Sequence, residues 1–218
     1  MKIKWLGHAC FVITSSDGVR IITDPYAVGE GINYSTIKET ADVVVVSHDH
    51  DDHSNVSAVK GTPQVVKGSG IKTARGIPFR GIATYHDTSQ GTQRGPNTVF
   101  CFTIDDIKLC HLGDLGHVLS RGQVNEIGAV DILFVPVGGF YTIDALVASQ
   151  VCAQLKPKIA IPMHFKTPDC TYPLAGVENF LKGKKDVIQV EDSEVEFEQE
   201  RFPAATKIVL LQPALSRN

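Results

Sequence analysis

The chain has 218 residues, of which 43% are hydrophobic and 21% are charged, and its formal net charge is −3. This length suits one domain with a sizeable core, spanning residues 1–218, and the slightly acidic balance provides no basic footprint for nucleic acid. No apolar run approaches the ~20 residues of a membrane span, and Met1 to Trp5 lacks the apolar core of a signal peptide.

The five cysteines are odd in number and form no Cys-x-x-Cys pair. Such a set favours reduced thiols over a disulfide framework or a zinc site. We therefore expect a cytoplasmic protein.

The N-terminal segment predicts a β-meander. Lys2 to Thr14 is strand-like and is broken at Gly7-His8, Ser15 to Gly18 has the composition of a hairpin turn, and Val19 to Thr23 forms the returning strand. Residues 26–40 are Gly-rich, polar and irregular, which is typical of a long loop that forms one wall of a site.

Apolar patterns and turn residues predict the remaining elements. Strands are expected at Val43–Val46, Gln64–Lys67, Gly81–Tyr85, Asn97–Thr103, Ile107–His111, Asp131–Pro136, Lys158–Pro162, Glu194–Phe197 and Lys207–Leu211. Helices are expected at Ser54–Val59, Ser120–Ile127, Thr142–Leu155 and Glu178–Lys182. The second helix opens on a capping box, and the third has an apolar stripe of Ile143, Leu146, Val147, Val151 and Leu155. Strands in the first half and β-α alternation in the second predict a layered α/β domain.

The densest chemical signal is the run Asp42 to Ser54. Its four valines form a short buried strand, which ends in His48, His50, Asp52 and His53. Imidazole suits zinc and similar transition metals, and carboxylate oxygen suits harder ions. Residues two apart on an extended chain face the same side, and the chain then curls toward a helix. One tight loop can thus serve two metal ions, whereas a plain solvated loop would leave its imidazoles to repel one another on protonation.

The remaining ligands must come from other strand ends. His86 follows the strand that ends at Tyr85, Asp114 lies in a Gly-Asp-Leu-Gly turn, and His164 follows the strand that ends near Met163. His111 also lies near a strand end and competes with His86 for the role of third histidine. A side chain three residues before Asp114 faces the other way on a regular strand, although a turn at Gly113 could rotate Asp114 and allow either histidine. His86 is favoured because it follows its strand directly and has no such conflict.

The run His-x-His-x-Asp-His after a hydrophobic strand resembles the signature of the metallo-β-lactamase-fold hydrolases. Further similar motifs follow in the order of that family: Trp5-Leu-Gly-His-Ala9, Thr23-Asp-Pro25, Gly113-Asp-Leu-Gly116, Pro136 to Thr142, and Ile161-Pro-Met-His-Phe165. Together these segments resemble the branch that contains the ascorbate-phosphate lactonases and many uncharacterised metal-dependent hydrolases.

The resemblance implies an α/β fold, the four-layer αββα sandwich of the metallo-β-lactamase fold. It also implies two divalent metal ions, with zinc favoured and manganese or iron as alternatives. One ion would be held by His48, His50 and His86, the other by Asp52, His53 and His164, and Asp114 would bridge them. Water bound to such ions has a pKa of about 7, so it supplies hydroxide at neutral pH.

Roles in catalysis are expected for three residues. Asp52 or Asp114 is a candidate proton acceptor, and His117 is a candidate contact for substrate or a proton donor. Two ions, two carboxylates and one hydroxide leave a charge of about +1, which favours an anionic small-molecule substrate.

Other candidates have structural alternatives of similar weight. Asp24 either orients a ligand imidazole or forms an Asp-Pro turn, and His8 either lines the pocket or is a packed histidine. Tyr141 either reaches an oxyanion or packs, and Lys166 either meets an anionic group or is solvated.

We therefore expect a hydrolase of a small, anionic ester, lactone or phosphodiester. The alternatives are a metal-dependent nuclease or phosphodiesterase, and a metal-binding regulatory protein without catalysis. A di-iron oxidoreductase is disfavoured, because its family has an acidic ligand where His50 stands. No nucleic-acid or membrane partner is expected, and a homo-oligomer is left open.

Overall fold

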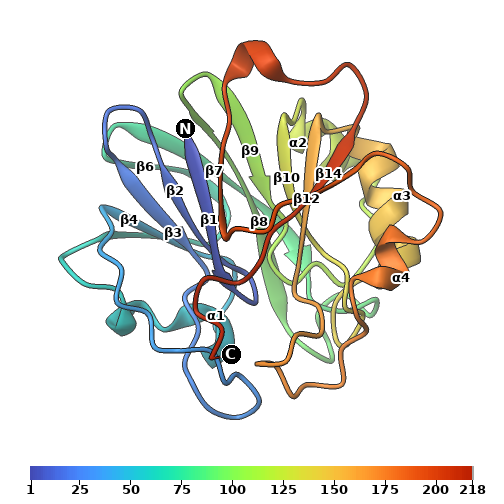
Figure 1. The fold of residues 1–218 in the computed structure, drawn as a ribbon, viewed down its shortest axis with the longest axis horizontal. Helices are drawn as coiled ribbons and strands as arrows, with labels where there is room; N and C mark the ends of the chain where they lie inside the picture. The colour runs from blue at the N-terminus through green and yellow to red at the C-terminus, as the bar shows by residue number, and fades with distance from the viewer. Residues whose placement is uncertain (218) are drawn as a thin grey trace.

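The computed structural model describes residues 1–217 and contains two β-sheets that face each other (Figure 1). The first sheet has the order β13-β1-β2-β3-β4-β5 and consists of β1 (Lys2–Gly7), β2 (Cys10–Thr14), β3 (Arg20–Thr23), β4 (Val43–Val46), β5 (Gln64–Lys67) and β13 (Glu194–Glu196). The second has the order β12-β14-β11-β10-β9-β8-β7-β6 and consists of β6 (Gly70–Ala74), β7 (Ile77–Tyr85), β8 (Pro96–Ile104), β9 (Ile107–His111), β10 (Ile132–Pro136), β11 (Ile159–Met163), β12 (Val187–Gln189) and β14 (Lys207–Leu210). The helices are α1 (Asp51–Ser54), η1 (Val56–Ala58), α2 (Arg121–Ile127), α3 (Ala145–Leu155), α4 (Glu178–Leu181) and η2 (Gln199–Arg201).

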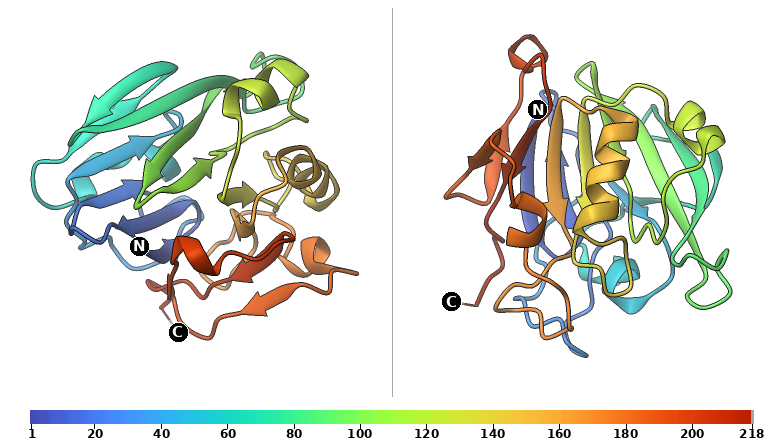
Figure 2. Two further views of the ribbon diagram at one scale, coloured as in Figure 1. Left: turned by 90° about the horizontal axis from the view of Figure 1, so that it is seen from above. Right: turned by 90° about the vertical axis from the view of Figure 1, so that its right-hand side faces the viewer.

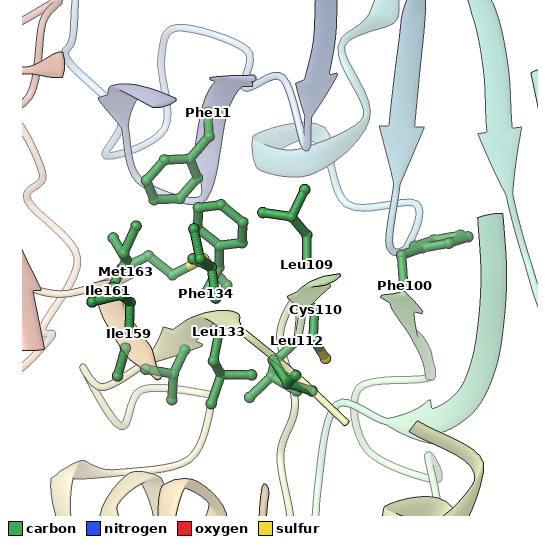
Figure 3. Packing of buried hydrophobic residues seen from close by; sticks show 14 of the residues in the cluster. Phe11, Phe100, Leu109, Cys110, Leu112, Leu133, Phe134, Ile159, Ile161 and Met163 are labelled. Atoms are coloured by element: carbon green, nitrogen blue, oxygen red, sulfur yellow. The ribbon is translucent and has the colours of Figure 1, made fainter. Parts of the chain in front are cut away.

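The main hydrophobic core fills the space between the two sheets. Phe11 of β2 faces Phe134 of β10 across this space, with ring centroids 4.5 Å apart (Figure 3). Figure 2 shows α3 and α4 on the outer side of the second sheet. The predicted sandwich is therefore confirmed.

The four valines of β4 are buried on both faces of the first sheet. Val43 and Val45 belong to the core between the sheets, whereas Val44 and Val46 belong to a second hydrophobic cluster on the outer side. Tyr26 and Tyr34, from the loop of residues 26–40, pack in that outer cluster. The outer layer on this side is thus built mainly from a loop, with the short helices α1 and η1 beside it.

An ion-pair cluster ties this loop to the first sheet. Glu39 accepts hydrogen bonds from Lys4 Nζ, at 3.0 Å, and from the Arg20 guanidinium. Burial acts to raise the pKa of Glu39, but the two basic partners outweigh it and lower the pKa below its usual value.

Parallel pairing decides where the functional residues lie. β3, β4 and β5 are parallel in the first sheet, and β9, β10, β11 and β14 are parallel in the second. The carboxyl ends of parallel strands meet at one edge of a sheet, which is the edge where ligands bind in open α/β sheets. The segments that follow β4, β9 and β11 therefore converge.

Several predicted elements differ from the structure. The helix expected at Thr142–Leu155 begins at Ala145, because the Asp144 side chain caps it by accepting a hydrogen bond from the Val147 N–H. Leu146, assigned to its apolar stripe, is 68% exposed. The helix expected at Ser54–Val59 is replaced by α1, which starts earlier, and η1. Strands β6 and β12 were not predicted.

Candidate metal centre

Three histidines form a first donor cluster. His48 and His50 follow β4, and Nε2 of the former lies 3.1 Å from Nδ1 of the latter. His86 follows β7 directly, and its ring centroid lies 4.9 Å from that of His48. One ring nitrogen from each of the three lies within 4.8 Å of the others. The structure thus brings together the three residues predicted to share one ion, and their role as ligands stays a prediction.

A second donor cluster contains Asp52, His53 and His164, the set predicted for the other ion, together with His8. Asp52 Oδ2 lies 3.8 Å from His53 Nε2 and 3.2 Å from His8 Nε2. The histidine at position 8 was expected only to line the pocket or to pack. Its position among the donors is an observation that the sequence did not supply.

Asp114 lies between the two clusters. Its Oδ1 is 3.3 Å from His53 Nε2, and its Oδ2 is 2.9 Å from His86 Nε2 and 3.3 Å from His164 Nε2. Gly113 has a φ of 54° and packs so closely that a Cβ would lie 2.5 Å from the Cβ of Ser47. This tight turn after β9 directs the carboxylate toward both clusters.

Buried donor atoms without partners indicate that these residues fit metal ions. Within the described chain, the buried atoms His53 Nε2 and Asp114 Oδ1 lie 3.3 Å apart without the geometry of a hydrogen bond, and neither has another hydrogen-bond partner. Such atoms are destabilising unless another group satisfies them. Imidazole nitrogen and carboxylate oxygen together match zinc, manganese and iron.

The electrostatic field of the site also favours cations. Burial lowers the pKa of His48 to about 3, so its ring is neutral at pH 7 and its nitrogen is available to a metal. Burial acts to raise the pKa of Asp114, but attraction to His164 and the other cluster histidines holds it well below its usual value. Burial likewise acts to lower the pKa of His53, yet the neighbouring carboxylates raise it well above the usual value. Positive charge is therefore stabilised between the carboxylates.

Asp24 contacts one histidine of the second cluster directly and one of the first cluster through Ser47. This fully buried carboxylate accepts hydrogen bonds from Ser47 N and Ser47 Oγ, each at 2.7 Å, and from His53 Nδ1 at 3.1 Å and His111 Nε2 at 2.8 Å. Ser47 Oγ lies in turn 2.9 Å from His48 Nδ1. An imidazole that binds a metal through Nε2 carries its proton on Nδ1, and such hydrogen bonds fix its orientation. His111 contacts this support and belongs to neither donor cluster.

A cavity of about 620 Å³ opens onto the donor clusters. It is lined by Ala27, Val28, Gly29, Glu30, Asp49, His50, Asp51, Asp52, His86, Arg94, Asp114, Phe140, Tyr141, His164 and Tyr172. Loop 26–40 supplies the first four of these residues, as expected of a wall of the site. Among the lining residues within the described chain, only Arg94 has a permanently cationic side chain, and its guanidinium lies over the ring of Tyr141.

The loop that presents Arg94 is fixed by one carboxylate. Asp87 accepts hydrogen bonds from the backbone N–H groups of Ser89, Gly91, Gln93 and Arg94 at 2.7–3.0 Å. Burial acts to raise the pKa of Asp87, but these donors outweigh it and lower the pKa. The loop is therefore ordered by its own first residues. No pattern in the sequence singled out Arg94.

A family model described as the beta-lactamase superfamily domain matches residues 2–164. The chain belongs to the metallo-β-lactamase superfamily. A solved structure of a Zn-dependent hydrolase of this superfamily, from Thermotoga maritima, has 40% sequence identity and a TM-score of 0.78, and the match covers 96% of this chain and 97% of that one. A UPF0173 metal-dependent hydrolase of Thermoplasma volcanium is 31% identical over 78% of this chain and 85% of its own length. Another, from Hyperthermus butylicus, is 25% identical over 97% of this chain and 96% of its own length.

The protein is thus a metal-dependent hydrolase of the metallo-β-lactamase superfamily. All five cysteines lie within residues 1–217 and are free thiols. No helix in this described part of the chain is long and apolar enough to span a membrane.

Three further candidate residues have the following positions in the structure. His117, predicted as catalytic, is not among the cavity-lining residues: its Nε2 accepts a hydrogen bond from the Tyr85 N–H at 3.2 Å, and its Nδ1 lies 2.9 Å from the Val118 carbonyl. The Lys166 ammonium donates to the Tyr172 carbonyl at 3.0 Å, and Lys166 is not among the cavity-lining residues. Tyr141 lines the cavity, and its carbonyl accepts a hydrogen bond from His86 Nδ1 at 3.2 Å.

Proposed function

We propose that this hydrolase uses two divalent metal ions to cleave a small anionic ester, lactone or phosphodiester. The observation that carries the proposal is the position of Asp114, whose two oxygens face donor atoms of both clusters. The first ion would be held by His48, His50 and His86, and the second by Asp52, His53 and His164, with Asp114 shared. Zinc is the favoured metal, and the same donors accept manganese or iron.

Bound divalent ions supply a hydroxide nucleophile at neutral pH and polarise the substrate oxygen. The side chains of this protein hold the ions, orient the ligands and shape the cavity. Of the two candidate carboxylates, Asp52 is the better proton acceptor, because its side chain is 18% exposed and lines the cavity. The Asp114 side chain is 3% exposed, and its oxygens already face three imidazoles.

The cavity supports a small-molecule substrate. Its volume of about 620 Å³ lies within the range of about 300–1,000 Å³ that is usual for small-molecule sites. Net positive charge at the ions and the Arg94 guanidinium both favour an anionic group. Nucleic acids are held mainly by several Lys and Arg contacts to their phosphates, and among the described lining residues only Arg94 is permanently cationic, so a nuclease is the weaker alternative.

The test combines metal analysis with a substrate screen. Protein reconstituted with zinc or manganese is expected to bind two ions per chain and to hydrolyse anionic members of a panel of lactones, phosphodiesters and acyl esters. Less than one ion per chain would overturn the dinuclear proposal. Two ions with no turnover across the panel would overturn the proposed substrate class. The predicted cytoplasmic location and oligomeric state are testable by fractionation and light scattering.

A further inference from the structure

The backbone at Gly7 and His8 has an unfavourable conformation, which directs the His8 side chain into the protein. The pairing of β1 with β2 shifts register between Trp5 and Gly7. Gly7 and His8 both have positive φ, of 132° and 53°. A non-glycine residue with positive φ is uncommon and is strained. Gly7 has no alternative, because a Cβ there would lie 2.8 Å from the ring of Tyr34. This local strain turns the histidine away from the strand and into the protein.

The backbone of His8 is fixed at the second donor cluster. Its carbonyl accepts hydrogen bonds from Trp5 Nε1 at 3.0 Å and from His164 N at 3.2 Å. Its ring lies 4.1 Å from the ring of His164 and 5.0 Å from that of His53, centroid to centroid. The position of His8 is therefore coupled to the ligand at the end of β11.

The ring of His8 offers a donor atom to the same point as the three predicted ligands. Its Nε2 lies 3.2 Å from Asp52 Oδ2, and one donor atom from each of His8, Asp52, His53 and His164 lies within 4.8 Å of the others. The residue is 1% exposed, and its Nδ1 has no hydrogen-bond partner in the described chain.

We propose that His8 is a protein ligand of the second metal ion. The inference rests on the dinuclear centre proposed above. The second ion then has five protein residues, His8, Asp52, His53, His164 and the shared Asp114, whereas the first has four. A five-residue nitrogen and oxygen set suits metals that accept higher coordination numbers, such as manganese or iron, better than tetrahedral zinc. The two positions would therefore differ in metal preference.

The principal variant is His8→Gly, because glycine adopts positive φ without strain and the variant should fold. His8→Gln retains a hydrogen-bond donor for Asp52 but is a poor metal ligand. His117→Ala removes a histidine outside the site and serves as the control. Metal content and dissociation constants are measured by chelator competition with Co²⁺ and Mn²⁺, and visible spectra of the Co²⁺ proteins report on ligand number. Circular dichroism of the metal-free proteins verifies folding.

Both His8 variants are expected to lose affinity for one of two ions by more than the ~10–100-fold that loss of an orienting hydrogen bond causes. The other ion should stay bound, and added imidazole should restore the lost one in His8→Gly. Full affinity in His8→Gln would show that the residue only orients Asp52 and would overturn the proposal, as would two tightly bound ions in His8→Gly. If the unmodified protein binds fewer than two ions, the dinuclear centre itself fails, and the inference fails with it.

Discussion

The most informative perturbation of the metal centre is the replacement of Asp24 by asparagine. Asp24 is fully buried and is not among the residues that line the cavity at the donor clusters, yet its Oδ2 lies 3.1 Å from Nδ1 of the predicted ligand His53 and 2.8 Å from His111 Nε2. Asparagine keeps the shape of the side chain, and its Oδ1 can still accept from the Ser47 N–H. Its amide group would place N–H donors opposite those two imidazoles. The change therefore removes the orientation of His53 while retaining most of the packing.

The expected loss of metal affinity follows from these contacts. Loss of a hydrogen bond that orients a metal-binding histidine costs about 10–100-fold in metal affinity, which is about 1.4–2.8 kcal/mol. Alanine would instead leave the Ser47 N–H and His111 Nε2 without their hydrogen-bond acceptor, which lowers the free energy of unfolding by about 1–3 kcal/mol for each buried group. That sum is a large part of the ~5–15 kcal/mol that stabilises a typical domain. Asparagine is therefore the cleaner variant.

The assay is a competition titration with a fluorescent chelator, in parallel with urea unfolding of the metal-free protein. Asp131→Asn provides the control, because Asp131 also accepts a backbone N–H, from Lys108 at 2.9 Å, but this hydrogen bond is exposed and lies away from the donor clusters. We expect weaker metal binding for Asp24→Asn alone. Unchanged metal affinity together with reduced stability would show that Asp24 is only a turn residue, and the reasoning would be refuted.

Three further outcomes are expected. His86→Ala should lose most activity and one equivalent of metal, whereas His111→Ala should keep both ions, since these imidazoles face Asp114 and Asp24 respectively; metal analysis giving the reverse would require a new ligand assignment. Arg94→Gln should lower kcat/KM for an anionic ester about 10–100-fold, from the ~1.5–3 kcal/mol of a charged hydrogen bond, and leave a matched neutral ester unchanged; an equal loss for both would contradict an anion-binding role. The depressed pKa of Glu39 stabilises the folded protein above the unfolded-state pKa of about 4.3, and this stabilisation is lost as the pH falls through the folded-state pKa. Urea unfolding at a series of pH values should show this loss of unfolding free energy in acid, and Glu39→Gln should make the loss smaller.

Local patterns in the sequence predicted much of the fold. The four valines of β4 and the ligands after them were recognisable because burial on both faces and two-residue spacing are properties of the chain itself. The capping box of α2 is present as predicted, because its partners are three residues apart. Strands β6 and β12 escaped prediction because they carry few buried apolar residues and their pairing is set by neighbouring strands. Periodicity assigned Leu146 to the buried stripe of α3, but the buried residues of this helix are Ala148, Val151 and Leu155, and which face packs on the sheet depends on tertiary contacts.

The candidate site also combines features that the sequence predicted with features that only the tertiary structure decided. The sequence by itself determined which residue types meet at strand ends, and all seven predicted ligands lie in the two donor clusters or between them. Only the tertiary structure decided the roles of residues whose partners are distant in the chain. Asp24 accepts hydrogen bonds from two imidazoles, those of His53 and His111. His8 lies in the second cluster because it contacts Asp52, which is 44 residues away in the chain. His117 accepts a hydrogen bond from the backbone N–H of Tyr85. These contacts depend on the register of two sheets packed face to face, and no short-range pattern encodes that register.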